Sequence, residues 1–82
     1  MLEKTITLDM LAPGQSATIK KILGKGALRR RLMDMGFTYG TPIQMIRPSP
    51  LGDPIEYKLR GYSLTLRKSE GQAIEVEISS TA

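Results

Sequence analysis

Apolar and polar residues alternate along several short segments of this chain, and turn-forming residues separate the segments. A period of two is typical of a β-strand that buries one of its faces. We expect five such strands, at residues 16–22, from residue 41 onward, and at 55–60, 62–67 and 74–78. Short, closely spaced strands predict an all-β fold, a small barrel, rather than a parallel sheet with covering helices. Closing the barrel would remove the exposed sheet edges that invite aggregation.

One segment, residues 26–35, has the period of a helix instead. Leu28, Leu32 and Met35 lie at i, i+4 and i+7, so they share one face, which we expect to be buried. Gly36 follows directly, and glycine is the residue that most often ends a helix in the left-handed conformation. The sequence therefore predicts one short helix, inserted after the first of the five expected strands.

Departures from these patterns predict local irregularities. The alternation breaks over residues 20–23, in front of Gly24, which indicates a bulge or a strand end. Residues 8–11 are expected to form a short helical turn that Asp9 caps. Residues 68–72 are expected to form a turn between the last two strands.

The chain has few aromatic side chains with which to build a binding groove. Tyr57 and Tyr62 are in phase with the apolar positions of their strands, so both are assigned to the core. The sequence contains four aromatic residues in all and no Trp, which argues against an aromatic-lined groove for proline-rich ligands. Addition of a partner's strand to a sheet edge is the better alternative for peptide binding.

Residues 48–54 are expected to form a stiff loop between two strands. Three prolines fix φ within it, and Gly52 permits a positive φ before Asp53. The Asp53 carboxylate is expected to accept hydrogen bonds from nearby backbone amides or to pair with Arg31 or Arg60.

Length and composition narrow the function classes. With 82 residues the chain is expected to form one domain, spanning 1–82. It contains no Cys and no His, which favours a reducing compartment and removes the commonest nucleophile–base pairs and soft metal ligands. We therefore expect no catalytic residue, no metal site and no cofactor, although weak iron(II) contacts through surface carboxylates stay open. No signal peptide or membrane-spanning run is recognisable, so a cytoplasmic protein without direct membrane insertion is expected.

Four side chains are candidates for contact with a partner. The formal net charge is +4, and basic residues cluster once, at Arg29, Arg30 and Arg31. A solvated helix face is favoured there over an RNA or DNA contact, and acidic protein surfaces or anionic lipid headgroups also fit. Arg31 lies beside the apolar stripe, so its head is expected to reach a carbonyl or carboxylate. Arg29, Arg30, the off-stripe Met33 and the loop-tip Leu51 are the four candidates.

Several sequence runs together resemble the FeoA family over nearly the whole chain. The runs are RLMDMGF at 31–37 with GTPI at 40–43, PLGDPI at 50–55, and RGYSLTLR at 60–67, and the opening 8–14 and closing 73–76 also match. A related domain occurs at the C-terminus of diphtheria-toxin-repressor-type regulators, but no winged-helix portion is present here. The motif residues expected to have structural roles are Arg31, Leu32, Met35, Gly36, Gly52, Asp53, Pro54, Arg60, Gly61 and Arg67.

The resemblance implies an SH3-like barrel that cooperates with FeoB, a membrane ferrous-iron transporter with a cytoplasmic GTP-binding domain. An adaptor role and a GTPase-modulating role are both open. In either role Arg29 or Arg30 would contact the GTPase, by charge complementarity or as an arginine finger that stabilises transition-state charge. The alternative is a small basic barrel that binds RNA or DNA, with strongly salt-dependent affinity. The docking face, the oligomeric state and the direction of any effect on transport stay open.

Overall fold

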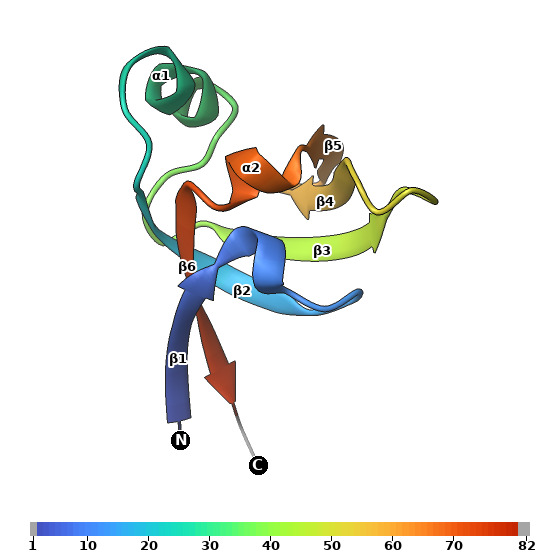
Figure 1. Cartoon of the computed structure of the whole chain (residues 1–82). Helices are drawn as coiled ribbons and strands as arrows, with labels where there is room; N and C mark the ends of the chain where they lie inside the picture. Colours follow the sequence, from blue (N-terminus) through green and yellow to red (C-terminus); the bar gives the residue numbers. More distant parts are fainter. Residues whose placement is uncertain (1, 81–82) are drawn as a thin grey trace.

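A six-stranded antiparallel sheet forms the body of the chain in the computed structural model, which describes residues 2–80 (Figure 1). The strands lie in the order β1-β6-β2-β3-β4-β5. In chain order the elements are β1 (Leu2–Thr7), the 3-10 turn η1 (Leu8–Met10), β2 (Ser16–Ile22), α1 (Gly26–Asp34), β3 (Pro42–Pro48), β4 (Ile55–Leu59), β5 (Tyr62–Leu66), α2 (Lys68–Gly71) and β6 (Ile74–Ser80). The all-β prediction, with a short helix inserted between two strands, is confirmed.

The number of strands and the closure of the sheet differ from the prediction. A sixth strand, β1, pairs with β6 along its whole length, from Leu2 opposite Ser80 to Thr7 opposite Glu75. Among the strands described, β1 and β5 each have one neighbour, so the sheet curls but is not closed by hydrogen bonds. The sheet thus has six strands where about five were expected and is not closed, while the all-β class stands as expected. The N-terminal strand covers the edge of β6 and itself becomes one edge of the sheet.

The core lies on the inner side of this curled sheet and is filled by the alternating strand positions. Ile55, Tyr57 and Leu59 of β4, for example, are buried while Lys58 between them is exposed. The buried apolar residues are Leu8, Leu11, Ala17, Ile19, Leu32, Phe37, Ile43, Met45, Ile55, Tyr57, Leu59, Leu66, Ile74 and Val76. One contiguous cluster of this kind is what a chain of this size can bury.

Tyr62 departs from the predicted core, and Leu28 and Met35 of the predicted helix stripe are partly buried and pack against the core. Tyr62 is 45% exposed, and its hydroxyl donates a hydrogen bond to the backbone carbonyl of Met35. The reason is its place at the start of the edge strand β5, beside the end of α1, where an amphipathic ring can cover apolar surface while its hydroxyl finds a partner. Its contribution is therefore a link between helix and sheet edge rather than core volume.

Two turns contain residues with positive φ, and each of these turns includes a glycine. Gly36 ends α1 with φ +106°, and a Cβ at this position would lie 3.3 Å from Leu59 Cδ2. The two residues that join β4 to β5, Arg60 and Gly61, both have positive φ, at 50° and 86°. A two-residue hairpin loop of this kind has the twist that matches the right-handed twist of the strands. The left-handed stop expected at Gly36 is thus confirmed.

Two local expectations are wrong. Residues 68–71 form the short helix α2 instead of an irregular turn. Asp9 does not cap η1, whose N-terminal flanking residue is Thr7; the Thr7 hydroxyl instead donates to Asp9 Oδ1 at 2.5 Å. The side chain that supports a helix start is Glu70, which accepts the Arg67 backbone N–H at 2.9 Å. This is the glutamate half of a capping box.

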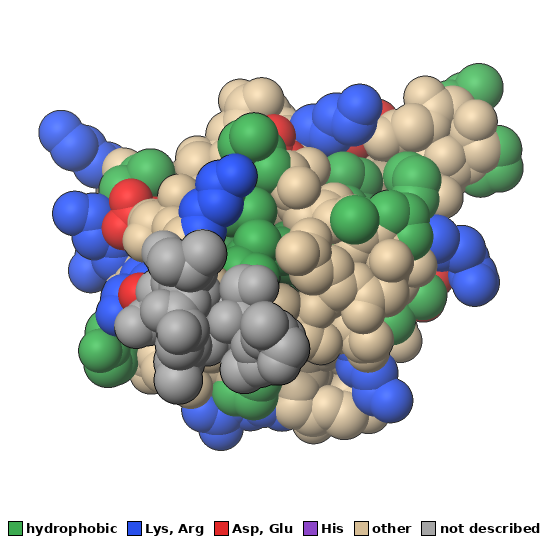
Figure 2. All heavy atoms as spheres, turned by 90° about the horizontal axis from the view of Figure 1, so that it is seen from below, with side chains coloured by type: hydrophobic (Ala, Val, Ile, Leu, Met, Phe, Trp, Pro, Cys, Tyr) green, Lys and Arg blue, Asp and Glu red, His purple; other side chains and the backbone are tan. Residues whose placement is uncertain are grey.

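The surface carries dispersed charge and no long apolar helix. Figure 2 shows one face of the molecule, on which Lys and Arg side chains lie mainly around the rim, separated by apolar and uncharged atoms. None of the described helices is long and apolar enough to cross a membrane.

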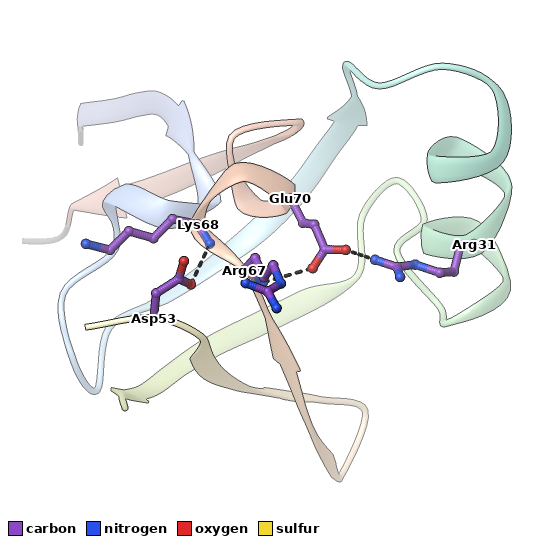
Figure 3. A network of polar contacts seen from close by, with 5 residues as sticks. All are labelled: Arg31, Asp53, Arg67, Lys68 and Glu70. Carbon is purple, nitrogen blue, oxygen red and sulfur yellow. Dashed lines mark hydrogen bonds and ion pairs between the residues drawn. The ribbon is translucent and has the colours of Figure 1, made fainter. Parts of the chain in front are cut away.

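A polar network links α1, α2 and the loop after β3 (Figure 3). Arg31 of α1 forms an ion pair with Glu70 of α2, and the same carboxylate accepts the Arg67 amide. The Asp53 carboxylate accepts the backbone N–H of Lys68 at 2.9 Å. The prediction that Arg31 reaches a carboxylate is confirmed, and of the alternatives for Asp53 the backbone amide is the one observed. Because Arg31 is about half exposed, its ion pair contributes modestly.

Glu70 is expected to matter more as a cap than as an ion-pair partner. We predict that Glu70→Ala lowers the free energy of unfolding by about 1 kcal/mol, because the Arg67 amide loses its acceptor. Glu70→Gln keeps that acceptor and should resemble Arg31→Ala, with a loss of roughly 0.2–1 kcal/mol. Urea unfolding followed by circular dichroism measures all three. Equal losses for Glu70→Ala and Glu70→Gln would contradict the capping role.

Tyr57 is expected to make stability depend on alkaline pH. It is 1% exposed, and burial, together with the charges of Asp9 and Asp53, raises the pKa of its phenol well above the ordinary 10.0. Above pH ~10 the phenol ionises in the unfolded chain but not in the folded one, so the unfolded state binds fewer protons and stability falls as pH rises.

The free energy of unfolding is measured from neutral to strongly alkaline pH for the Tyr57→Phe and Tyr39→Phe variants. Tyr39 is the control, because its side chain is 74% exposed. Tyr57→Phe should flatten the alkaline decline, and Tyr39→Phe should leave it unchanged. Identical declines for the two variants would show that Tyr57 is not the responsible group.

Candidate docking groove

The three consecutive arginines of α1 point in three directions. Successive residues of a helix are about 100° apart around its axis, so neighbours cannot share a face. Arg29 Nη1 donates to the Ile22 carbonyl of β2 at 3.2 Å, Arg31 pairs with Glu70 of α2, and Arg30 is exposed. The basic cluster seen in the sequence is therefore divided in space. This geometry argues against reading it as one nucleic-acid contact patch.

A groove lies between α1, strand β2 and the segment that follows the helix. It has a volume of about 390 Å³ and is lined by Ile19, Lys20, Lys21, Ile22, Arg29, Met33, Phe37, Thr38 and Tyr39. Ile19 and Phe37 are buried and form its base, whereas Met33 and Tyr39 are 43% and 74% exposed. The lining residues include three cations and no carboxylate. The groove therefore combines apolar surface with positive charge.

A bulge in β2 explains why two consecutive lysines line the same groove. In a regular strand, side chains of successive residues point to opposite faces. Here the pairing of β2 with β6 shifts after Ile19, which lies opposite Val76, to Lys21, which lies opposite Glu75, so that Lys20 is the extra residue. Strand β2 then ends at Ile22. The bulge or strand end expected from the broken alternation is confirmed.

Contacts hold Lys20 at the rim of the groove. Its Nζ atom lies 3.7 Å from Glu77 Oε1 on β6 and 5.1 Å from the centre of the Tyr39 ring. The second contact is a cation–π arrangement, which at an exposed site contributes about 0.5–1 kcal/mol. Lys20 thus orders the exposed ring of Tyr39, which forms part of the groove wall.

The proline-containing loop offers a separate exposed feature. Leu51, at its tip, is 95% exposed, and Gly52 has φ +89°. A hollow of about 300 Å³ beside the tip is lined by Arg47, Pro48, Ser49, Pro50, Pro54 and Glu56, none of which lines the groove. Figure 1 places this loop and α1 on opposite sides of the molecule. The loop and the groove are therefore distinct surfaces.

The four residues predicted to contact a partner do not all lie in the groove. Arg29 and Met33 line the groove, whereas Arg30 and Leu51 do not. Sequence reasoning missed Lys20 and Tyr39 as lining residues, although the break in alternation at residue 20 was a usable signal. Arg60 donates to the Thr41 hydroxyl at 3.2 Å and belongs to neither surface.

The groove and the hollow beside the loop suit the binding of a partner better than catalysis. Within residues 2–80, as far as their side chains are described, no group of three or more His, Cys, Asp or Glu is placed to hold a metal ion. The lining of the groove contains no carboxylate, and in the hollow beside the loop Glu56 is paired with Arg47. What the groove can do is accept apolar side chains and carboxylates from another molecule.

Two solved bacterial structures are similar to this chain over most of its length. A FeoA-like protein from Clostridium acetobutylicum is 40% identical, with a TM-score of 0.86 over 96% of this chain and 92% of its own. The zinc complex of Stenotrophomonas maltophilia FeoA is 28% identical, with a TM-score of 0.78 over 87% of this chain and 88% of its own, and is described as a prokaryotic SH3 domain protein. The SH3-like fold expected from the sequence is confirmed.

The family comparisons agree with these structures. A curated relative, the Fe(2+) transport protein A/Fe(2+) transporter FeoB fusion protein of Porphyromonas gingivalis, is 36% identical over 74 residues. The match covers 90% of this chain but 9% of that protein, so the chain spans less than a tenth of its relative's length. The FeoA domain family matches residues 6–78. The chain belongs to the FeoA domain family.

Proposed function

We propose that the protein is a non-catalytic, cytoplasmic adaptor that docks on the GTP-binding region of a FeoB-type ferrous iron transporter and modulates iron(II) uptake. The observation that carries this proposal is the Porphyromonas gingivalis fusion, in which a segment similar to this chain is joined to FeoB. Linking two modules in one chain raises their effective concentration, which favours modules that act in contact. A separate chain of the same family would make that contact between molecules.

The surface features support a role in binding. The groove between α1 and β2 presents apolar side chains beside cations, a combination that suits a protein partner. The sequence has no His or Cys, the side chains that most often serve as bases and nucleophiles. Modulation would therefore arise from docking itself, through the conformation it favours in the transporter.

The arginines of α1 could act on the GTPase in two ways. A finger must extend into the partner's nucleotide site to stabilise transition-state charge, which is a demanding geometry. Arg29 already donates to Ile22 and would have to leave that bond, whereas Arg30 is exposed. Charge complementarity asks only that the arginines face acidic groups, and it is the contribution we favour.

The immobilised full-length protein is expected to retain the transporter from detergent-solubilised native membranes. Binding of RNA and DNA oligonucleotides, measured by fluorescence anisotropy at two salt concentrations, should be weak at both. Tight oligonucleotide binding that falls steeply with salt, together with no retention of the transporter, would contradict the proposal and favour a nucleic-acid-binding barrel.

GTP hydrolysis separates the two roles of the arginines. With a saturating amount of the Arg29→Ala/Arg30→Ala variant, the transporter should hydrolyse GTP at the same rate as with the wild-type protein, because docking by charge changes affinity and not the bound state. The variant should need a higher concentration to reach saturation. If the variant still forms the complex but no longer stimulates GTP hydrolysis by the transporter, an arginine finger would be established instead.

A further inference from the structure

We infer that the groove between α1 and β2 is the docking surface, and that its occupant is a short segment of the transporter's cytoplasmic region that carries both carboxylates and apolar side chains. This inference rests on the function proposed above. It names which of the protein's faces makes the contact and which chemistry the partner presents to it.

The apolar part of the groove has the size and exposure of a peptide-binding surface. Its volume of about 390 Å³ lies in the range of ligand pockets, roughly 300–1,000 Å³. Met33 of α1 and Tyr39 of the segment after the helix are large and exposed, whereas Ile19 and Phe37 in the same lining are buried. Methionine adapts its shape to a partner, and tyrosine supplies rigid contact area with little loss of entropy.

The charges define what would lie next to these apolar walls. Lys20, Lys21 and Arg29 are the charged residues of the lining. Lys20 is engaged by Glu77, and Glu75 lies opposite Lys21 in the strand pairing, so each lysine has an acid beside it on β6. Lys21 and Arg29 are exposed. The bond from Arg29 to Ile22 uses one of five guanidinium donors.

Charge complementarity therefore selects an acidic occupant with apolar anchors. Carboxylates of the occupant would meet Lys21 and Arg29, and its apolar side chains would lie between Met33 and Tyr39. A nucleic acid is a poorer fit, because its phosphates call for a continuous basic track, whereas the groove sets three cations beside apolar side chains. In the hollow beside the loop tip the one cation, Arg47, is already paired with Glu56.

Cross-linking can locate the contact because the chain contains no cysteine. A Met33→Cys variant labelled with a maleimide photo-cross-linker, added to membranes containing the transporter, should yield an adduct with the transporter. Mass spectrometry should map the adduct to a segment rich in Asp or Glu and in apolar residues. The matched Leu51→Cys variant, whose side chain is at least as exposed, should give little adduct.

Charge reversal tests the same surface without a label. Lys21→Glu/Arg29→Glu should weaken binding to the transporter at least about tenfold, because two favourable contacts become repulsive. Lys4→Glu/Lys58→Glu makes the same change in net charge at exposed positions outside the groove and should weaken binding by about threefold or less. Circular dichroism and thermal unfolding confirm that each variant is folded.

The outcomes separate the groove from the proposed function. If the wild-type protein binds the transporter but both variant pairs behave alike, the function stands and the groove is overturned. If the wild-type protein fails to bind the transporter, the function and the groove fail together. A Met33 adduct with a second copy of this chain, or with nucleic acid, would also overturn the groove as a transporter site.

Discussion

The fold depends on one set of apolar side chains that pack against the inner face of a single curled sheet. The helices and loops pack against that cluster. Helix α1 has nine residues, and Leu32 is its one fully buried residue. Phe37, just beyond the helix, adds a second anchor. Because so little of the helix is needed to hold it, its remaining faces are available for polar contacts, and a groove opens between the helix and β2.

The orientation of α1 comes from contacts that are individually modest. Arg31 reaches Glu70 on one side, and Arg29 reaches the Ile22 carbonyl on the other. Both arginines are solvent-exposed, so these contacts define direction more than they add stability. Glu70 also supports the first turn of α2, which couples the two helices through one carboxylate. The arginines of α1 are thus held by polar contacts outside the core, whereas Ile19 and Phe37 in the groove lining belong to the core.

The sequence predicts best where packing decides the structure. The alternation of Ile55, Tyr57 and Leu59 correctly places their strand, since a period of two fits one buried face. Strand β1 was missed because its pairing with β6 joins the two ends of the chain, and no local pattern shows which partner a strand finds. Tyr62 was misassigned because phase along a strand does not reveal an edge. The groove itself could not be predicted, because it needs the helix and β2 placed in space, although Arg29 and Met33 were identified as candidates.

The bulge at Lys20 has a consequence for how this surface can change. A single additional residue in β2 places Lys20 and Lys21 along one wall and shifts the pairing with β6. Loss of Lys20 would restore the strict two-residue repeat and leave Lys21 as the one lysine on that wall. The polarity of the wall is therefore encoded by chain length as well as by residue type. Between related proteins, a one-residue insertion or deletion here would alter partner preference while every core position kept its amino acid.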